Sequence, residues 1–208
     1  MFNSNKEDLN ETQIKIMEAA MAEFLEKGFS GARMQNIADN AGMNKALLHY
    51  YYRNKESLFK QVFLDVLIDM FSMLTDIIET EIDFESKLNK LVKSYMNYLI
   101  EHRQFPLFLL NEIYRNPEIV DQVLRESDVT ETWDKFYNEL CQSQKNGDVI
   151  ELNPAHIIVT IVSLVVFPVA ASNVITRFAD ISQSEYYEFL QERIDIIPEF
   201  LIKALLKK

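Results

Sequence analysis

The chain is poor in the residues that turn or cross-link a polypeptide. Its 208 residues include four glycines, five prolines and a single cysteine, Cys141. So few turn-forming residues argue against extended β structure, and the sequence predicts an all-α fold. One cysteine cannot form an internal disulfide, and we expect Cys141 to be a buried thiol in a protein of the reducing cytosol.

Signatures of targeting, metal binding and catalysis are also missing. The first ten residues, MFNSNKEDLN, have neither the basic nor the apolar region of a secretory signal, so we expect a cytoplasmic protein. His49, His102 and His156 are far apart and have no cysteine or carboxylate at ligand spacing, so no metal site is predicted. There is no glycine-rich phosphate loop and no serine elbow. We therefore expect neither an enzyme nor a bound cofactor.

Acidic residues outnumber basic ones, and the excess is confined to one part of the chain. The formal net charge is -11. Residues 1–60 contain 8 Lys and Arg against 8 Asp and Glu, so residues 61–208 carry the whole excess. Within 27–60 there are six basic and two acidic residues, a local charge of +4. This modest local charge favours DNA binding through a moderate number of phosphate contacts.

Residues 37–58, IADNAGMNKALLHYYYRNKESL, have the pattern of a helix-turn-helix. Ala38 is small enough for two helices to approach each other, and Gly42 suits a turn at positive φ. Asn44 is placed to cap a second helix, in which Leu48 would be a buried anchor. The spacing therefore predicts two short helices joined by a tight turn.

The second helix of this motif would present a basic and aromatic face. Residues four apart share one face of a helix, and two such rows are Lys45 with His49 and Ala46 with Tyr50. Leu48 and Tyr52 would point the opposite way and hold the helix in place. The outer face would suit phosphates and base edges in a major groove.

The run Tyr50-Tyr51-Tyr52 has an alternative interpretation, because aromatic residues at helical spacing are commonly part of a core. Consecutive residues step by about 100° around a helix, so the three side chains cannot all point inward. At least one of these tyrosines must face solvent or a ligand.

The motif and its flanks resemble the amino-terminal domain of the TetR family of bacterial transcription regulators. The shared pattern covers about residues 12–59 and consists of Thr12, Ile16, Ala19-Ala20, Phe24, Gly28-Phe29, Ile37-Ala38, Ala41-Gly42, Lys45, Leu48, the three tyrosines, Lys55-Glu56 and Leu58-Phe59. The chain departs from the family pattern in three places. Ala32-Arg33 stands where the family often has two hydroxyl residues, His49 where it often has tyrosine, and Tyr52 where it often has phenylalanine. The first departure removes an expected helix cap and offers Arg33 to a phosphate instead.

The resemblance implies a homodimeric, DNA-binding transcription regulator. We expect a helix-turn-helix head in residues 1–54 and a helical ligand-binding and dimerisation domain in 55–208. A repressor that leaves its operator when a small-molecule inducer binds is expected; the operator, the regulated genes, the inducer and the sign of regulation stay open. The alternative is a helical ligand-binding or protein-interaction dimer without useful DNA affinity. The residues expected at double-stranded operator DNA are Arg33, Asn44, Lys45, Ala46, Leu47, His49, Tyr50, Tyr51 and Lys55.

Apolar periodicity predicts nine helices, over about 10–27, 34–40, 45–51, 55–79, 84–102, 106–115, 117–145, 154–178 and 184–206. Segment 154–178 is apolar almost all round, but polar residues interrupt it and it falls short of about 18 clean apolar residues, so no membrane span is expected. Such a helix must be buried by a neighbour. We therefore expect 154–178 and 184–206 to pack against a second copy of the chain, and a charge at Val165 or Leu201 to give monomers or aggregates.

Residues 95–137 concentrate aromatic side chains, several with polar tips. Each alone is commonly a core residue, but together they can line an apolar cavity with a few polar anchors, as in many small-molecule sites. The family resemblance implies that an inducer binds in this second domain. The candidate lining residues are Tyr95, Tyr98, His102, Phe105, Phe108, Asn111, Glu112, Trp133, Phe136, Tyr137 and Asn173.

Overall fold

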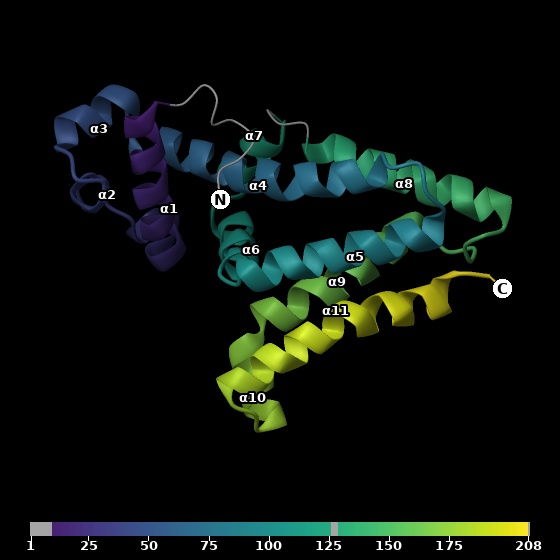
Figure 1. The fold of residues 1–208 in the computed structure, drawn as a ribbon. Coiled ribbons are helices and arrows are strands. Elements are labelled where there is room, and N and C mark those ends of the chain that lie inside the picture. Colours follow the sequence, from purple (N-terminus) through teal and green to yellow (C-terminus); the bar gives the residue numbers. More distant parts are fainter. Residues whose placement is uncertain (1–9, 126–128, 208) are drawn as a thin grey trace. The chain divides into compact units, whose positions relative to one another are not determined.

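The computed structural model describes residues 10–125 and 129–207, which form eleven helices (Figure 1). In chain order these are α1 (Glu11–Gly31), α2 (Met34–Asn40), α3 (Lys45–Tyr51), α4 (Lys55–Ile78), α5 (Phe84–Glu101), α6 (Phe105–Arg115), α7 (Pro117–Arg125), α8 (Val129–Asn146), α9 (Pro154–Ala170), α10 (Ser172–Ala179) and α11 (Gln183–Leu205). The predicted all-α fold is confirmed.

Two of the nine segments predicted as single helices each correspond to two helices in the structure, so these two predictions were wrong. The segment 117–145 corresponds to α7 and α8, and residues 126–128 between them lie outside the described part of the chain. The segment 154–178 corresponds to α9 and α10, which meet at an angle of 76°. These two divisions account for the difference between nine predicted helices and eleven observed ones.

The helices belong to two compact units. Unit 1 consists of Met1–Phe71 with Leu107–Thr130, and unit 2 consists of Ser72–Pro106 with Glu131–Lys208. Helix α4 is continuous and contributes residues to both units. Unit 1 thus contains α7 and most of α6 as well as the three head helices. The functional boundary between residues 54 and 55 stays a prediction.

Asparagine caps fix several helix starts where the sequence predicts them. The Asn44 side chain accepts a hydrogen bond from the Leu47 amide at 2.8 Å, at the start of α3. The Asn54 side chain accepts one from the Ser57 amide at 2.8 Å, at the start of α4. Each bond satisfies an amide that has no partner within its own helix.

Gly28 kinks α1 three residues before its end. Its φ of 66° and ψ of 174° lie in a region that only glycine adopts readily. A Cβ at this position would lie 3.0 Å from Oε1 of Glu112. The first helix, predicted to end near residue 27, is therefore kinked at Gly28 and resumes as far as Gly31.

Aromatic rings form the core of unit 1. The Phe59 ring of α4 lies 5.0 Å from that of Phe24 and 4.9 Å from that of Phe29, measured between centroids. It also lies 5.5 Å from Phe63 and 6.2 Å from Phe108 of α6. Edge-on, tilted and stacked ring pairs of this kind add to the stabilisation that burial gives. The cluster joins α1, α4 and α6.

Helices α5, α9 and α11 pack together in unit 2. Side chains of α11 also bond to the last turns of α9, just before the chain turns into α10. Pro168 lacks an N–H, so the Leu164 carbonyl loses its helical partner. Nη2 of Arg193 donates to that carbonyl at 3.4 Å. The buried Tyr186 hydroxyl donates to the carbonyl of Pro168 itself. Side chains of α11 therefore stabilise the last turns of α9.

Two expectations about single side chains were wrong. Cys141 is half-buried rather than buried. Val165 and Leu201, chosen as dimer contacts, are fully buried within their own chain. A charge at either position would therefore disrupt the fold of the chain itself.

No single described helix is long and apolar enough to cross a membrane. Helices α9 and α10 reach the required length and composition only when they are counted together, across their 76° bend.

Candidate nucleic-acid interface

Helix α3 is anchored by its inner face. The Leu48 side chain has no exposed surface, and Tyr52, directly after the helix, is 9% exposed. Gly42 has a φ of 69° in the turn, and the Met43 amide donates to the Ala38 carbonyl at 2.9 Å. The predicted inward orientation of Leu48 and Tyr52 is confirmed.

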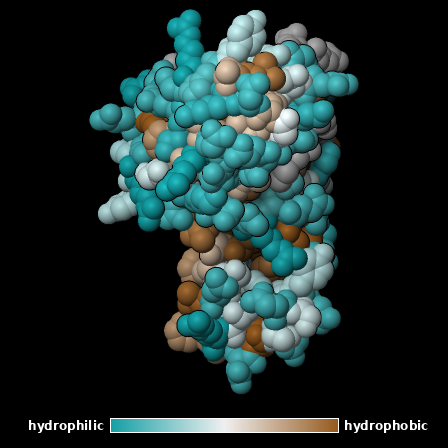
Figure 2. All heavy atoms as spheres, turned by 90° about the vertical axis from the view of Figure 1, so that its left-hand side faces the viewer, coloured by the Kyte–Doolittle hydropathy of each residue, from teal (hydrophilic) through white to brown (hydrophobic). Residues whose placement is uncertain are grey.

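The outer face of α3 is open to solvent. Tyr50 is 81% exposed, Tyr51 is half-buried, and their rings meet edge to face at 5.3 Å. The other exposed members of the predicted DNA-binding set are Arg33, Asn44, Lys45, Ala46, Leu47 and His49. In Figure 2, mostly hydrophilic side chains cover the upper part of the surface, where α2 and α3 lie. The structure thus brings the α3 residues of the predicted set onto one exposed surface.

Ion pairs reduce the number of basic groups available to DNA. Lys27 pairs with Glu23 at 2.7 Å, and Lys60 pairs with Glu56 at 2.6 Å. Exposed basic residues at and around α3 are Arg33, Lys45 and Arg53. Three exposed basic side chains of the head are therefore available to phosphates, and Lys45 belongs to α3 itself.

The backbone orients the His49 ring. Nδ1 of His49 lies 3.1 Å from the carbonyl oxygen of Arg53. A carbonyl can only accept, so this contact is a hydrogen bond when Nδ1 carries the proton, and Nε2 is then an acceptor. An acceptor at the outer face can take a hydrogen bond from a base amino group in a major groove.

Lys55 has structural partners that the sequence did not indicate. Its ammonium group donates to the carbonyls of Ser30 at 3.2 Å and Ala32 at 3.1 Å, and lies 4.8 Å from the centre of the Phe29 ring. Lys55 thereby joins the start of α4 to the end of α1. An ammonium group has three donors, so the predicted phosphate contact of Lys55 stays a prediction.

Glu23 is the main residue of the head that sequence reasoning missed. Glu23 is only 2% exposed. Its carboxylate accepts a hydrogen bond from the Arg33 amide at 3.1 Å and another from the Asn36 side chain at 2.9 Å. Burial alone would raise the pKa of Glu23, but hydrogen bonds from Lys27, Arg33 and Asn36 outweigh it, so the pKa is lowered. The Arg33 side chain does not cap α2. Glu23, from α1, accepts hydrogen bonds at the start of α2 instead.

The sequence of this head matches a known family. The family model for bacterial regulatory proteins of the tetR family matches residues 16–62, which include α2, α3 and the start of α4. The chain belongs to the TetR family. It is therefore a DNA-binding transcription regulator of a non-enzymatic family, as the sequence predicts.

Relatives and solved structures extend this similarity along the chain. The "probable HTH-type transcriptional regulator YttP" of Bacillus subtilis is 25% identical over 190 residues, which cover 89% of this chain and 91% of YttP. The transcriptional repressor NicS of Pseudomonas putida is 30% identical over 102 residues, 49% of this chain and 48% of NicS. The fold resembles that of FadR from Bacillus subtilis in complex with stearoyl-CoA, with a TM-score of 0.68 and 16% sequence identity over 91% of this chain and 97% of FadR.

The residues predicted to line an inducer site lie in both units of this TetR-family chain. Tyr98, His102 and Phe105 form one cluster in unit 2, with the His102 ring 4.5 Å from Tyr98 and 5.0 Å from Phe105. Tyr95 is buried nearby on α5, and burial raises its pKa to about 12. Phe136 of α8 stacks on Phe84 with centroids 6.5 Å apart.

Other members of that predicted set have different surroundings. Phe108 packs on Phe59 and Phe63 in the core of unit 1. Glu112 accepts a hydrogen bond from the Phe29 amide at 3.0 Å and another from the Asn116 side chain at 2.6 Å. Asn111, Trp133, Tyr137 and Asn173 are exposed. Phe108 and Glu112 thus have structural roles within unit 1, and the inducer site stays a prediction.

Proposed function

We propose that this TetR-family regulator is a homodimeric repressor. Each protomer would place one α3 helix in a major groove, and the two helices would read half-sites about one turn of DNA, or ~34 Å, apart. A small molecule bound in the second domain would release the protein from its operator. The observation that supports DNA reading most directly is the outer face of α3, where Lys45, His49 and Tyr50 are exposed on a helix anchored by buried Leu48.

The roles of these side chains differ in the proposal. Lys45, Ala46 and His49 lie in the early turns of α3 and would be nearest the bases, whereas Tyr50 would bind a phosphate. Lys55 would also bind a phosphate, but its contacts with Ser30 and Ala32 make Lys55→Ala a mixed test of DNA binding and folding.

The DNA-binding test uses fluorescence anisotropy with duplexes from upstream of the chain's own coding sequence. Tyr50→Phe should weaken binding to every duplex by about fivefold, as expected for the loss of about 1 kcal/mol. Lys45→Ala should change the ranking of duplexes with altered bases, because Lys45 is proposed to lie nearest the bases. His49→Ala should change the ranking of duplexes with altered bases. Lys90→Ala removes an equal charge from exposed α5 and is the matched control.

Two outcomes would contradict the proposal. Unchanged affinity and unchanged duplex ranking for His49→Ala would mean that this face of α3 does not read DNA. A folded dimer that binds none of the upstream duplexes would favour a helical ligand-binding or protein-interaction dimer instead.

The release step follows from differential binding. The crystal structure of FadR contains stearoyl-CoA, which supports a small-molecule site in a protein of this fold. Helix α4, continuous from Lys55 to Ile78, would carry the signal, because 24 residues span roughly 36 Å and a small tilt displaces its ends. A ligand that weakens operator binding by some factor must itself bind more weakly, by the same factor, when operator is present. Equal ligand affinity with and without operator would exclude α4 as a lever.

A further inference from the structure

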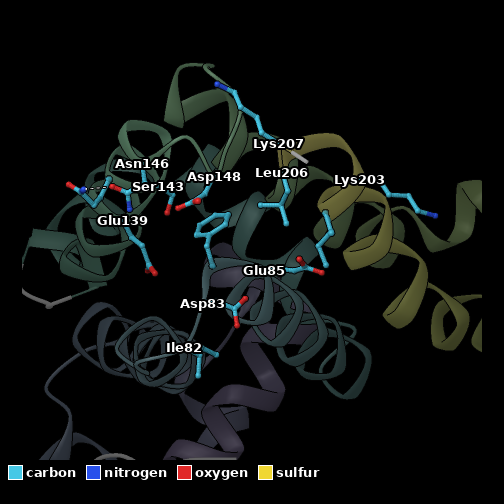
Figure 3. Close-up of a pocket in the computed structure, with 13 residues that line it drawn as sticks. Ile82, Asp83, Glu85, Glu139, Ser143, Asn146, Asp148, Lys203, Leu206 and Lys207 are labelled. Carbon is cyan, nitrogen blue, oxygen red and sulfur yellow. Dashed lines mark hydrogen bonds between the residues drawn. The ribbon is translucent and has the colours of Figure 1, made fainter.

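A cavity lies where α8 and α11 end and α5 begins, all within unit 2 (Figure 3). Its volume of about 730 Å³ is within the range of small-molecule sites. The lining residues come from 82–85, 139–148 and 202–207. None of the residues predicted for the inducer site is among them, so this cavity is independent of the proposed function.

The cavity has an apolar part that suits the body of an organic molecule. Phe84, Ile202 and Leu206 line it from α5, α11 and the residue after α11. Phe84 is fixed by its stacking on Phe136, with an interplanar angle of 11°. Apolar lining with a few polar groups is the usual composition of such sites.

Carboxylates dominate the charge of the lining. Asp83, Glu85 and Asp148 line the cavity together with Glu139, which is paired with Lys87 at 2.6 Å. Two lysines also belong to the lining, but Figure 3 shows both side chains pointing away from the space between the carboxylates.

Both of these lysines pair with acids that do not line the cavity. Lys203 pairs with Glu199 at 2.5 Å, and Lys207 pairs with Glu151 at 3.4 Å. Their charges are thus largely compensated elsewhere. Asp83, Glu85 and Asp148 are exposed, so the cavity is open to solvent and its rim carries a net negative charge.

Two helix ends add to this negative potential. Helix α8 ends at Asn146 and helix α11 at Leu205, both beside the cavity. A helix carries partial negative charge at its carboxyl end, which favours a cation there. The amino end of α5 has the opposite sign, but Asp83 caps it by accepting from the Ser86 amide at 2.9 Å. The helix ends and the carboxylates thus favour the same class of ligand.

Backbone hydrogen bonds hold the walls in place. The Ile150 amide donates to the Leu205 carbonyl at 2.9 Å, and the Lys207 amide donates to the Asp148 carbonyl at 3.0 Å. Val149 and Leu206 form an antiparallel bridge between these bonds. The segment after α8 is therefore fixed to the end of α11, and the backbone of Asp148 lies in this fixed part of the wall.

We propose that this cavity binds a small organic cation: a protonated amine or quaternary ammonium group with an apolar body. The ammonium group would lie among Asp83, Glu85 and Asp148, and the apolar body against Phe84 and Leu206. Within residues 10–125 and 129–207, no three His, Cys, Asp or Glu side chains are close enough together to hold a metal ion. Carboxylates spread out in this way suit an organic ammonium group, which is larger than a metal ion and does not need closely spaced oxygen ligands.

Isothermal titration calorimetry on the full chain tests this site without DNA. The probes are spermidine, which carries several amines, and benzyltrimethylammonium, which carries one charge on an aromatic body. Benzyl alcohol is the neutral comparison, and magnesium chloride tests for unspecific attraction to acidic residues. At least one organic cation should bind with a one-to-one stoichiometry, more tightly than both comparisons by about tenfold or more. A DNA-binding failure would leave this result unchanged, so the two proposals fail separately.

Variants then locate the binding. Glu85→Gln with Asp148→Asn should weaken cation binding by about tenfold or more, whereas Glu188→Gln, the same change on exposed α11, should leave it unchanged. Asn146→Lys places a competing cation at the rim and should have the same effect as the double variant. Circular dichroism and thermal unfolding would establish that each variant is folded. Absence of cation binding to the unaltered chain, or equal affinity in the double variant and in Glu188→Gln, would overturn the proposal.

Discussion

Glu23 shows how one carboxylate can determine the shape of a small domain. It accepts from the Arg33 amide and the Asn36 side chain, and it pairs with Lys27 one turn away. These bonds connect α1 to the first turn of α2. We therefore expect Glu23 to contribute more to stability than an exposed ion pair on a helix surface. Without it, its partly buried partners would lack a hydrogen-bond acceptor.

Glu23→Gln should lower the free energy of unfolding at neutral pH by about 1–3 kcal/mol, since the amide cannot satisfy all three partners. The pKa of Glu23 is lowered in the folded state, so its contribution is present above the ordinary carboxyl pKa and is lost as pH falls through the lowered value. The difference between the two proteins should therefore shrink in acid. Urea unfolding at several pH values measures it, with Glu26→Gln, exposed on the same helix, as the control. A constant difference across that pH range would show that the ionised form of Glu23 is not what matters.

Among the elements, the last turns of α9, before the corner with α10, are stabilised by a side chain of α11. Proline leaves the Leu164 carbonyl without its helical bond, and Arg193 replaces the missing donor. The two side chains are 25 positions apart but act on the same carbonyl. Their effects on stability are therefore expected to be coupled.

A double-mutant cycle of Pro168→Ala and Arg193→Met tests that coupling. Arg193→Met alone should cost about 1 kcal/mol, because it removes the donor to the Leu164 carbonyl. In the Pro168→Ala background the new amide can bond to that carbonyl, so the same change should cost measurably less. Denaturant unfolding of the four proteins gives the coupling energy. Strict additivity would mean that Arg193 contributes only through its packing.

The sequence predicted best those elements whose causes are local. The start of α3 follows from Asn44 and its exposed face from the four-residue spacing, and both were recognised without a structure. The α9–α10 corner was missed because its stabilising donor, Arg193, is distant in the chain. The contacts of Lys55 with Ser30 and Ala32 were missed for the same reason.

The predicted inducer site also depends on contacts between residues that are distant in the chain, which the sequence pattern does not identify. Helical periodicity indicates that Phe108 and Glu112 share a face of one helix, but it does not identify the neighbour of that face. In the structure these two residues pack against Phe59 and bond to the Phe29 amide, within unit 1. Tyr98 and His102 cluster in unit 2. The cavity near Asp148 had no signal in the sequence, because three distant segments form it.

At the scale of the whole molecule, the proposed dimer requires apolar surface that the chain leaves uncovered. Helices α9 and α11 expose Phe167 by 61% and Phe200 by 59%, and Val159 and Ile196 are similarly exposed. Figure 2 shows hydrophobic side chains on the lower part of the surface, where α9 to α11 lie. Exposed apolar surface on this scale commonly marks an interaction site.

Phe167→Glu with Phe200→Glu should therefore give folded monomers. Analytical ultracentrifugation at micromolar concentration would measure the mass, and circular dichroism would show that the helices remain. Val165→Glu is the informative comparison, because Val165 is buried within the chain and its charge should unfold the protein. A monomer in the unaltered protein, or a dimer in the double variant, would contradict an interface built on α9 and α11.

Lys87 gives helix α4 a fixed end. Its buried ammonium group donates to the carbonyl of Ile78, the last residue of α4, at 2.6 Å, and pairs with Glu139 at 2.6 Å. Moving that end would leave a buried charge without its partners, which is costly. In the proposed release step Ile78 would therefore be the fixed end of α4, and any displacement of the helix would grow with distance from Ile78.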